Sequence, residues 1–408
     1  MRIFERIKES LSYEHVRLFW LFAGLEATFW IAVSVGNYFT VYMQEQEFST
    51  STIGIVNSVI SAVGIFASLF WGMISDRIGS IKQVVIIILI GSSILLPFVP
   101  IAGHIKFAGI SLAVVIGVMA FFFRNPAGTL VDNWTVRGCN SLGLNYGSVR
   151  SCGSFAFAVV GVALSFILPT TGVECTFYIS PILMVFCILI CFRINYGDGE
   201  RGRAKKQEGM KIGSLFRNYY YVTYLIFYVG LLLATSSNYS FIPMLLKGVG
   251  ASGAQMGLVT GYRALLEIPM LMLLRPLRRK FPLYVLIIGG GIMFALESLL
   301  LGFAGALWQL ILFTTFSGLA NGLLIAGGAN YVLGLAPEGL KATAQTVVVS
   351  AASLSGIVGN ACGGFVIEAL GVSAFYRILG CLIAFVTLFY IASFVFGKRV
   401  LKKEIPDG

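Results

Sequence analysis

The sequence has few charged residues for its length. Only 12% of its 408 residues are Asp, Glu, Lys or Arg, whereas a soluble domain has about 25%. A larger soluble core does not account for the deficit, because a larger core still needs a charged surface. With 57% hydrophobic residues, the composition excludes an ordinary soluble domain and indicates an exterior that faces lipid.

Features typical of enzymes and secreted proteins are also missing. The seven cysteines are odd in number and form no CxxC pair, so we expect no disulfide framework. We find no nucleotide-binding loop, metal-ligand spacing or nucleophile motif, so neither an enzyme nor a bound cofactor or metal is expected. The apolar segment after the charged N-terminus is too long for a signal peptide, and the first helix should therefore remain in the mature protein.

Twelve long apolar segments dominate what is present. A helix needs about 20 apolar residues to cross a bilayer, and the 47 glycines suit close helix packing. We therefore predict an all-α membrane protein with twelve transmembrane helices. The predicted spans are 16–43, 53–74, 82–99, 107–131, 147–168, 173–194, 218–245, 253–274, 282–303, 307–333, 341–367 and 373–396.

The basic residues are distributed unevenly between the loops. Of 29 Lys and Arg, 23 lie in the N-terminus, the even-to-odd loops or the C-terminal tail; Lys106 and Lys247 lie in loops on the other side, and four lie inside helices. This bias predicts a multi-pass protein of the cell membrane with both termini in the cytoplasm. The net charge of +11 then indicates contact with anionic lipid headgroups, and no nucleic-acid partner is expected.

The longest polar segment lies near the middle of the chain. Residues 195–217 are rich in Lys and Arg, and we interpret them as a cytoplasmic linker between two six-helix bundles, 1–194 and 218–408. A weak internal match between residues 54–79 and 257–282, each ending in a basic loop, favours a duplication. Parallel halves of this kind are a known transporter plan.

The loop after the second span carries a short motif. It reads Gly72-Met73-Ile74-Ser75-Asp76-Arg77-Ile78-Gly79, which resembles the G-x-x-x-D-R-x-G signature of the major facilitator superfamily. The resemblance implies a solute transporter in which Gly72, Asp76, Arg77 and Gly79 form a gating motif at the cytoplasmic face. An ordinary basic turn is the alternative, and Ser80 stands where the family often has a basic residue.

The fourth and fifth spans carry a second resemblance. Asp132 is followed 18 residues later by Arg150, which a glycine follows in turn, and this spacing is similar to that of the lactose permease and phenylpropionate permease branch. In the lactose permease these charges bind the sugar and an aromatic residue stacks on it, which implies substrate-binding roles for Asp132, Arg150 and Phe157. A structural ion pair is the alternative. The histidine and glutamate that the lactose permease carries on helix 10 are absent from 307–333, so any proton coupling must use carboxylates.

Further charges fall inside predicted spans, where each costs at least about 2.5–3.5 kcal/mol unless it pairs or faces water. Glu26, Glu267 and Glu297 are candidate proton carriers, because a lone buried carboxyl prefers its neutral form; a neutral acid hydrogen-bonded to a helix is the alternative. Glu26 also counts as a substrate-binding candidate. Arg263 and Glu267 share a helical face, either as substrate-binding residues or as a pair that neutralises itself.

Uncharged polar residues and one further arginine complete the candidates. Asn37, Asn238, Asn330 and Gln345 are expected either to bind solute or to serve as interhelical hydrogen-bonding groups. Arg124 is expected either to neutralise an acid across a cavity or to be structural.

These observations predict a proton-coupled importer of a small polar solute. Sugars or oligosaccharides are the first choice, followed by nucleosides and aromatic acids. Sodium remains an alternative coupling ion, and we expect a monomer surrounded by membrane lipids. An efflux antiporter is disfavoured because the fifth span lacks the Gly-Pro pair of many drug exporters. A non-transporting nutrient receptor is disfavoured by the short linker.

Overall fold

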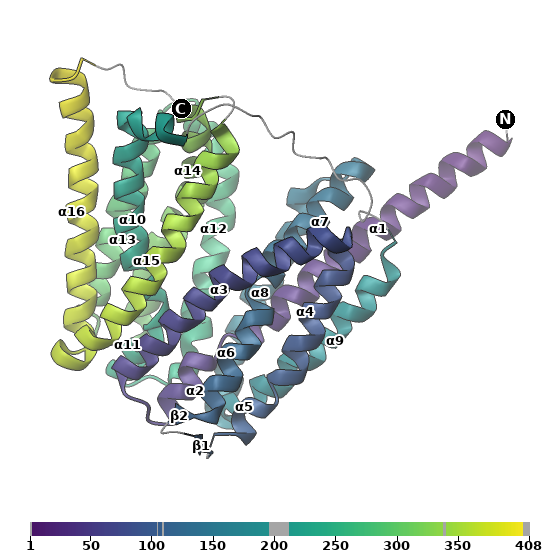
Figure 1. The fold of residues 1–408 in the computed structure, drawn as a ribbon, viewed down its shortest axis with the longest axis horizontal. Coiled ribbons are helices and arrows are strands. Elements are labelled where there is room, and N and C mark those ends of the chain that lie inside the picture. Colours follow the sequence, from purple (N-terminus) through teal and green to yellow (C-terminus); the bar gives the residue numbers. More distant parts are fainter. Residues whose placement is uncertain (1, 104, 108–109, 196–211, 338–339, 403–408) are drawn as a thin grey trace. The chain divides into compact units, whose positions relative to one another are not determined.

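The predicted all-helical architecture is confirmed by the computed structural model (Figure 1). The structure describes residues 2–103, 105–107, 110–195, 212–337 and 340–402. Its internal contacts divide the chain into two compact units: Met1–Tyr42 with Val63–Arg203, and Met43–Ala62 with Ala204–Gly408. Most of the expected linker, residues 196–211, lies outside the described residues.

The first half of the chain contains nine α-helices, a single 3₁₀ turn and one small hairpin within the described residues. The elements are α1 (Arg2–Val35), α2 (Phe39–Glu45), α3 (Thr50–Ile78), α4 (Ile81–Leu95), α5 (Phe98–Ile101), β1 (Lys106–Phe107), β2 (Ile110–Ser111), α6 (Leu112–Arg124), α7 (Ala127–Leu142), α8 (Tyr146–Thr171), η1 (Val173–Cys175) and α9 (Thr176–Arg193). The two strands pair antiparallel. In the first unit α1 packs most extensively against α8 and α9.

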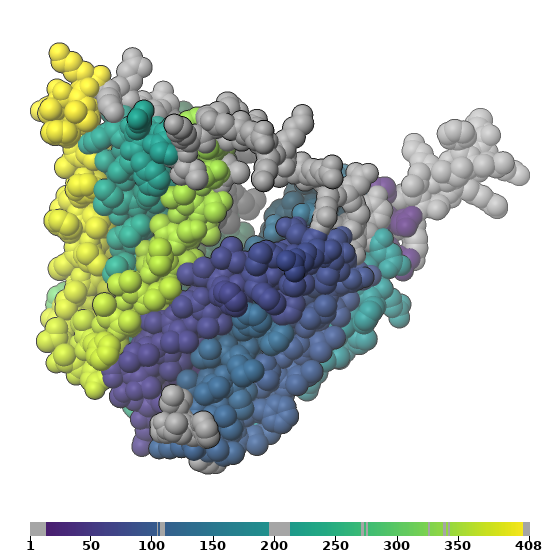
Figure 2. Space-filling model, in the orientation of Figure 1, coloured from purple at the N-terminus to yellow at the C-terminus, as the bar shows by residue number. Residues whose placement is uncertain are grey.

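The second half contains seven α-helices and two 3₁₀ turns within its described part. They are η2 (Ile212–Arg217), α10 (Tyr219–Ser240), α11 (Ile242–Gly248), η3 (Gly253–Gln255), α12 (Met256–Arg278), α13 (Leu283–Leu301), α14 (Leu307–Leu335), α15 (Lys341–Leu370) and α16 (Val372–Arg399). Helix α10 contacts both α15 and α16, and Figure 2 shows these three helices side by side in teal, green and yellow.

Eleven of the described helical segments are long and apolar enough to cross a membrane. The eighth predicted span corresponds to α12, which is not among the eleven and carries Arg263 and Glu267 within its length. Large apolar side chains cover the outer surfaces of other spans; Phe166 and Phe385, for example, are each 68% exposed. Such an exterior suits a hydrocarbon solvent.

Four of the predicted spans are interrupted, although the sequence indicated one apolar segment at each. The breaks separate α1 from α2, α4 from α5, α6 from α7 and α10 from α11. Pro97, Pro126 and Pro243 lie at three of them, where proline removes a backbone donor and clashes with the preceding turn. The fourth span also begins at Leu112 instead of residue 107, because the hairpin occupies the start of the predicted segment.

The first part of α3 packs closely on α15, which explains why Met43–Ala62 belongs to the second unit. A Cβ atom on Gly54 would lie 2.9 Å from Cα of Gly364. One turn further along α3, the Ser58 hydroxyl donates a hydrogen bond of 2.7 Å to the carbonyl of Ile357. Small residues at both positions permit this approach of the two backbones.

Candidate functional site

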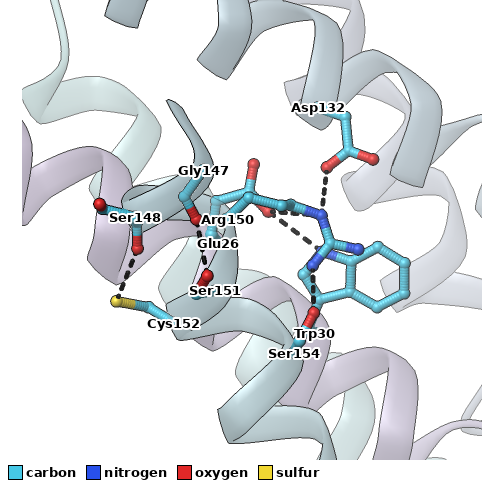
Figure 3. Close-up of polar contacts among 9 residues, drawn as sticks. All are labelled: Glu26, Trp30, Asp132, Gly147, Ser148, Arg150, Ser151, Cys152 and Ser154. Atoms are coloured by element: carbon cyan, nitrogen blue, oxygen red, sulfur yellow. Dashed lines mark hydrogen bonds and ion pairs between the residues drawn. The ribbon is translucent and has the colours of Figure 1, made fainter. Parts of the chain in front are cut away.

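Helices α1, α7 and α8 bring three charged side chains together in the first unit (Figure 3). The Arg150 Nε atom lies 3.1 Å from Oδ1 of Asp132 and 4.0 Å from Oε2 of Glu26. The pairing of Asp132 with Arg150 follows the sequence expectation, and the structure adds Glu26 from α1 to the same cluster.

A glycine on α8 allows α1 to reach the arginine. A Cβ atom on Gly153 would lie 3.2 Å from the Glu26 carbonyl oxygen and 2.5 Å from Cδ1 of Trp30. At the start of α8, the Asn145 side chain accepts a hydrogen bond from the Ser148 amide and so caps the helix. The glycine that follows Arg150 in the sequence therefore serves the close packing of α1 on α8.

Trp30 and Ser154 also belong to this cluster, although the sequence analysis did not single them out. The Trp30 indole N–H donates to Oε2 of Glu26 at 3.1 Å, and the Arg150 Cζ atom lies 4.3 Å from the Trp30 ring centre. Arg150 also donates to the Ser154 hydroxyl at 3.0 Å. Each of the two residues stands four positions after a charged member of the cluster, and that spacing is the signal that could have found them.

The members of the cluster differ in burial. The Glu26 side chain is fully buried, whereas those of Asp132 and Arg150 are 32% and 25% exposed. Thr135 on α7 also interacts with the Glu26 carboxyl. The half-buried Phe157 ring lies 6.3 Å from the Trp30 ring in an edge-to-face arrangement. The cluster thus presents a guanidinium and a carboxylate at an accessible surface, with a second carboxyl sealed behind them.

This arrangement has a simple chemical consequence. A guanidinium offers several planar donors and a carboxylate several acceptors, so Arg150 and Asp132 together suit a ligand rich in hydroxyl groups. Two acids and one base leave one surplus negative charge when both acids are ionised, and uptake of one proton neutralises the cluster. Glu26 is the member that is shielded from water.

The second unit arranges its charges differently. No ion pair joins Arg263 to Glu267 in the described part of the chain. Glu267 instead accepts a hydrogen bond of 2.9 Å from the Asn321 amide. The Arg263 guanidinium lies near the faces of Tyr239 and Phe294, at 5.8 Å and 5.9 Å from the ring centres. The two residues therefore do not neutralise each other in this structure.

Glu297 and Asn238 meet in the interior of the second unit. The Asn238 amide donates to Oε2 of Glu297 at 3.4 Å and to the Ser298 hydroxyl at 3.2 Å. Glu297 is 2% exposed and Asn238 is 4% exposed. The contacts tie α10 to α13, which corresponds to the alternative interpretation of Asn238 as an interhelical hydrogen-bonding group.

Arg124 and Asn37 lie at the break between α1 and α2. The buried Arg124 guanidinium donates to the carbonyl of Val33 at 2.8 Å and to that of Gly36. Because these carbonyls end α1, a cation at this place also complements the helix dipole. On α15, the Gln345 amide donates to the carbonyl of Ala329 at 2.8 Å.

The gating motif occupies the end of α3. Gly79 has a φ angle of +77° and is the residue whose backbone conformation calls for glycine. The Asp76 and Arg77 side chains are exposed, and a Cβ atom on Gly72 would meet no atom within 4 Å. The close approach expected at Gly72 is therefore not formed within the described residues of this structure.

Comparison with known proteins gives a family for the whole arrangement. Residues 29–378 match the model of the MFS_1 like family. The chain is 25% identical over 388 residues to the uncharacterized transporter YwbF of Bacillus subtilis (strain 168), a match that covers 91% of this chain and 90% of that protein. It is 25% identical over 344 residues to the maltose permease of Geobacillus stearothermophilus, covering 83% and 84%.

Solved structures give the same fold. The nucleoside transporter NupG superposes with a TM-score of 0.69 at 16% identity, covering 93% of this chain and 98% of that one. The D-xylose-proton symporter superposes with a TM-score of 0.65 at 14% identity, covering 93% and 97%. These matches confirm the predicted major facilitator fold of twelve transmembrane helices.

Proposed function

The chain belongs to the MFS_1 like family and is a multi-pass membrane transporter, not an enzyme, and on this premise we propose that it imports a small polar solute by proton symport. The observation that carries the proposal is the cluster in which Arg150 lies 3.1 Å from Asp132 and 4.0 Å from Glu26. An accessible ion pair can exchange its partner for a solute, while the buried acid beside it can take up a proton.

A sugar or an oligosaccharide is the solute that this chemistry favours. Hydroxyl groups pair well with a guanidinium and a carboxylate at the same time, and the Phe157 ring stands two helical turns past Arg150, where it can stack on a sugar ring. The maltose permease among the relatives and the D-xylose-proton symporter among the similar folds support a sugar. The nucleoside transporter among those folds keeps nucleosides as the next candidates, followed by aromatic acids.

We propose Glu26 as the proton carrier. The only histidines of the chain, His15 and His104, stand outside the predicted spans, so a carboxyl within a span is the group proposed for this work. Glu26 is fully buried directly behind the accessible pair of Arg150 and Asp132, so a proton taken up there changes the charge of the cluster without reaching the solute. Glu267 and Glu297 are the alternative carriers, because both accept hydrogen bonds from uncharged amides.

Counterflow in proteoliposomes tests the proposal directly. Purified protein should exchange labelled maltose for unlabelled maltose without any gradient, and an inward proton gradient should drive accumulation of maltose. A panel of lactose, xylose, uridine and phenylpropionate locates the solute if maltose is not exchanged. Exchange of no member of the panel would contradict the solute class. Accumulation that follows a sodium gradient instead would contradict proton coupling.

The orientation and the gate are part of the same proposal. We propose that both termini and the 195–217 linker face the cytoplasm, as the basic residues predict, so tags at these places should be inaccessible from outside intact cells. Asp76→Asn should impair transport more than solute binding, because the charge at the end of α3 would shift the balance between inward- and outward-facing states. Labelling of a tag from outside would overturn the orientation, and normal uptake in Asp76→Asn would overturn the gate.

A further inference from the structure

Trp30 contacts both functional parts of the cluster at once. Its indole N–H donates to the Glu26 carboxyl at 3.1 Å, and the flat face of its ring lies 4.3 Å from the Arg150 guanidinium carbon. In Figure 3 the indole overlaps the Arg150 guanidinium and is joined to Glu26 by a dashed line. The edge of the ring is held against α8 at Gly153, where a Cβ atom would come within 2.5 Å of Cδ1.

The two contacts constrain different groups by different means. A hydrogen bond from the N–H fixes one oxygen of the carboxyl and stabilises its charged form more than its neutral form. The ring face attracts the guanidinium through the aromatic quadrupole and gives it a rigid surface to lie against. Trp30 stands one helical turn after Glu26 and is hydrogen-bonded to it. A displacement of the Glu26 carboxyl therefore acts directly on the Trp30 side chain.

We propose that Trp30 is a positioning residue that couples the protonation of Glu26 to the place of Arg150, an inference that rests on the proton symport proposed above. With Glu26 neutral, the arginine pairs with Asp132 at the accessible side of the cluster. With Glu26 ionised, the arginine is drawn along the face of Trp30 toward Glu26, which its Nε atom already approaches to 4.0 Å. The second position releases Asp132 and removes the guanidinium from the solute.

The groups that act on Glu26 come from two helices besides its own. Asp132, Thr135 and Cys139 from α7, and Arg150 and Tyr146 from α8, interact with its carboxyl. Helix α9, which also packs on α1, contributes no such group among the described residues. Arg150 is the one cation in this set, so its position is the variable that a proton on Glu26 can change.

Infrared spectroscopy of the purified protein tests the first contact without any solute. Wild type at acidic pH should show a carbonyl stretching band of a neutral carboxyl that is absent in Glu26→Gln. In Trp30→Phe that band should move to higher frequency, because the carboxyl loses one hydrogen bond. Trp20→Phe is the matched control, since Trp20 lies on the same helix and is 66% exposed. An unchanged band in Trp30→Phe, or no Glu26 band at any pH, would overturn the inference.

Transport of labelled maltose tests the coupling. Trp30→Phe keeps an aromatic face but loses the N–H, so counterflow should persist while accumulation driven by a proton gradient is lost. Trp30→Leu loses both contacts, and its maltose affinity should fall by about 2- to 30-fold, the range of a cation–π contact. A structural role alone would lower both activities together and in step with thermal stability, and that result would refute coupling through Trp30.

The two proposals fail in different ways. If wild type exchanges maltose but does not accumulate it under a proton gradient, the proposed symport is wrong, and the infrared comparison still decides whether Trp30 holds the Glu26 carboxyl. If wild type accumulates maltose and Trp30→Phe accumulates it equally well, the symport stands and the role of Trp30 is refuted.

Discussion

The two units both bury acids in apolar helices, but they satisfy them in opposite ways. In the first unit Glu26 and Asp132 share one arginine, which touches both within 4.0 Å. In the second unit Glu267 and Glu297 accept hydrogen bonds from the amides of Asn321 and Asn238. Arg263 of that unit lies against aromatic rings and acts on Glu297 electrostatically, without sharing its charge between two acids.

This difference separates a cluster that can change its charge distribution from one that is held in place. An arginine between two acids can move from one to the other at little cost, because each end of the movement is an ion pair. In the second unit Glu297 interacts electrostatically with Arg263, but its hydrogen bonds come from uncharged groups such as the Asn238 amide, so no arginine is shared between two acids there. We therefore expect solute binding and coupling to depend on the first unit more steeply than on the second.

The largest effect should come from the shared arginine. Arg150→Ala and Arg150→Lys should both lower solute affinity by at least about tenfold, equivalent to about 1.4 kcal/mol, because lysine keeps the charge but lacks the planar fork. Arg263→Lys, the matched change in the second unit, should cost less. Binding of labelled maltose by the purified variants, with thermal stability recorded alongside, makes the comparison.

A structural ion pair would behave differently in the same experiment. Lysine would then largely rescue the protein, and the double variant Asp132→Ala/Arg150→Ala would be more stable than either single variant, since no charge is left without its partner. Wild-type affinity in Arg150→Lys would remove this pair from the solute site.

The next effect concerns coupling and separates the acids of the two units. Glu26→Gln should abolish accumulation of maltose driven by a proton gradient while exchange persists, because the amide cannot take up the proton. Glu297→Gln should retain accumulation, since an amide replaces the buried acid without altering its volume. Uptake against a gradient and counterflow in the same vesicles give the two readouts. Loss of accumulation in Glu297→Gln but not in Glu26→Gln would identify Glu297, and not Glu26, as the proton carrier.

A smaller effect should appear in the stability of the second unit, where Glu297 is hydrogen-bonded to Asn238. Glu297→Ala leaves the buried Asn238 amide without one acceptor and should lower the free energy of unfolding by about 1–3 kcal/mol. Glu297→Gln supplies an oxygen at the same place and should stay close to wild type. Thermal unfolding in detergent measures both, and equal stability of the two variants would argue that the Asn238 contact contributes nothing.

The smallest effect should come from the aromatic residue beyond the cluster. Phe157→Ala should weaken maltose binding by about 0.5–1.5 kcal/mol, or about two- to tenfold, if its ring stacks on the solute. Phe157→Trp should be tolerated, because it keeps a flat face. Phe155→Ala is the control on the same helix, where the side chain is 60% exposed. Equal affinities in all three variants would exclude stacking.

The pair of Asp132 and Arg150 could be anticipated because the 18-residue spacing of the two charges resembles that of the lactose permease branch, in which such charges lie together. The contacts of Arg263 could not be anticipated in this way. Its spacing from Glu267 indicated that both lie on one helical face, but Asn321 of α14 donates a hydrogen bond to Glu267 at 2.9 Å. The spacing does not indicate which helix lies alongside α12.

The breaks in the spans show the same limit. Proline marks three of them, and its effect on a helix is local. The break between α1 and α2 carries no proline. The carbonyls of Val33 and Ala32 at the end of α1 accept hydrogen bonds from Arg124 on α6 and from Ser180 on α9. A helix can end inside the membrane only when residues from other parts of the chain donate hydrogen bonds to its last backbone carbonyls.

The sequence by itself therefore determined that this chain crosses a membrane about twelve times and which residues place charge inside the bilayer, and its resemblance to a known family indicated which two of them pair. Hydropathy, helical periodicity and loop length are properties of residues that are close in sequence, so they can be obtained from the sequence alone. Only the tertiary structure decided that Glu26 and Trp30 join Arg150 and that Glu297 is held by Asn238. Those contacts depend on the rotation of each helix about its axis and on its lateral neighbours, and these are set by the packing of all helices together.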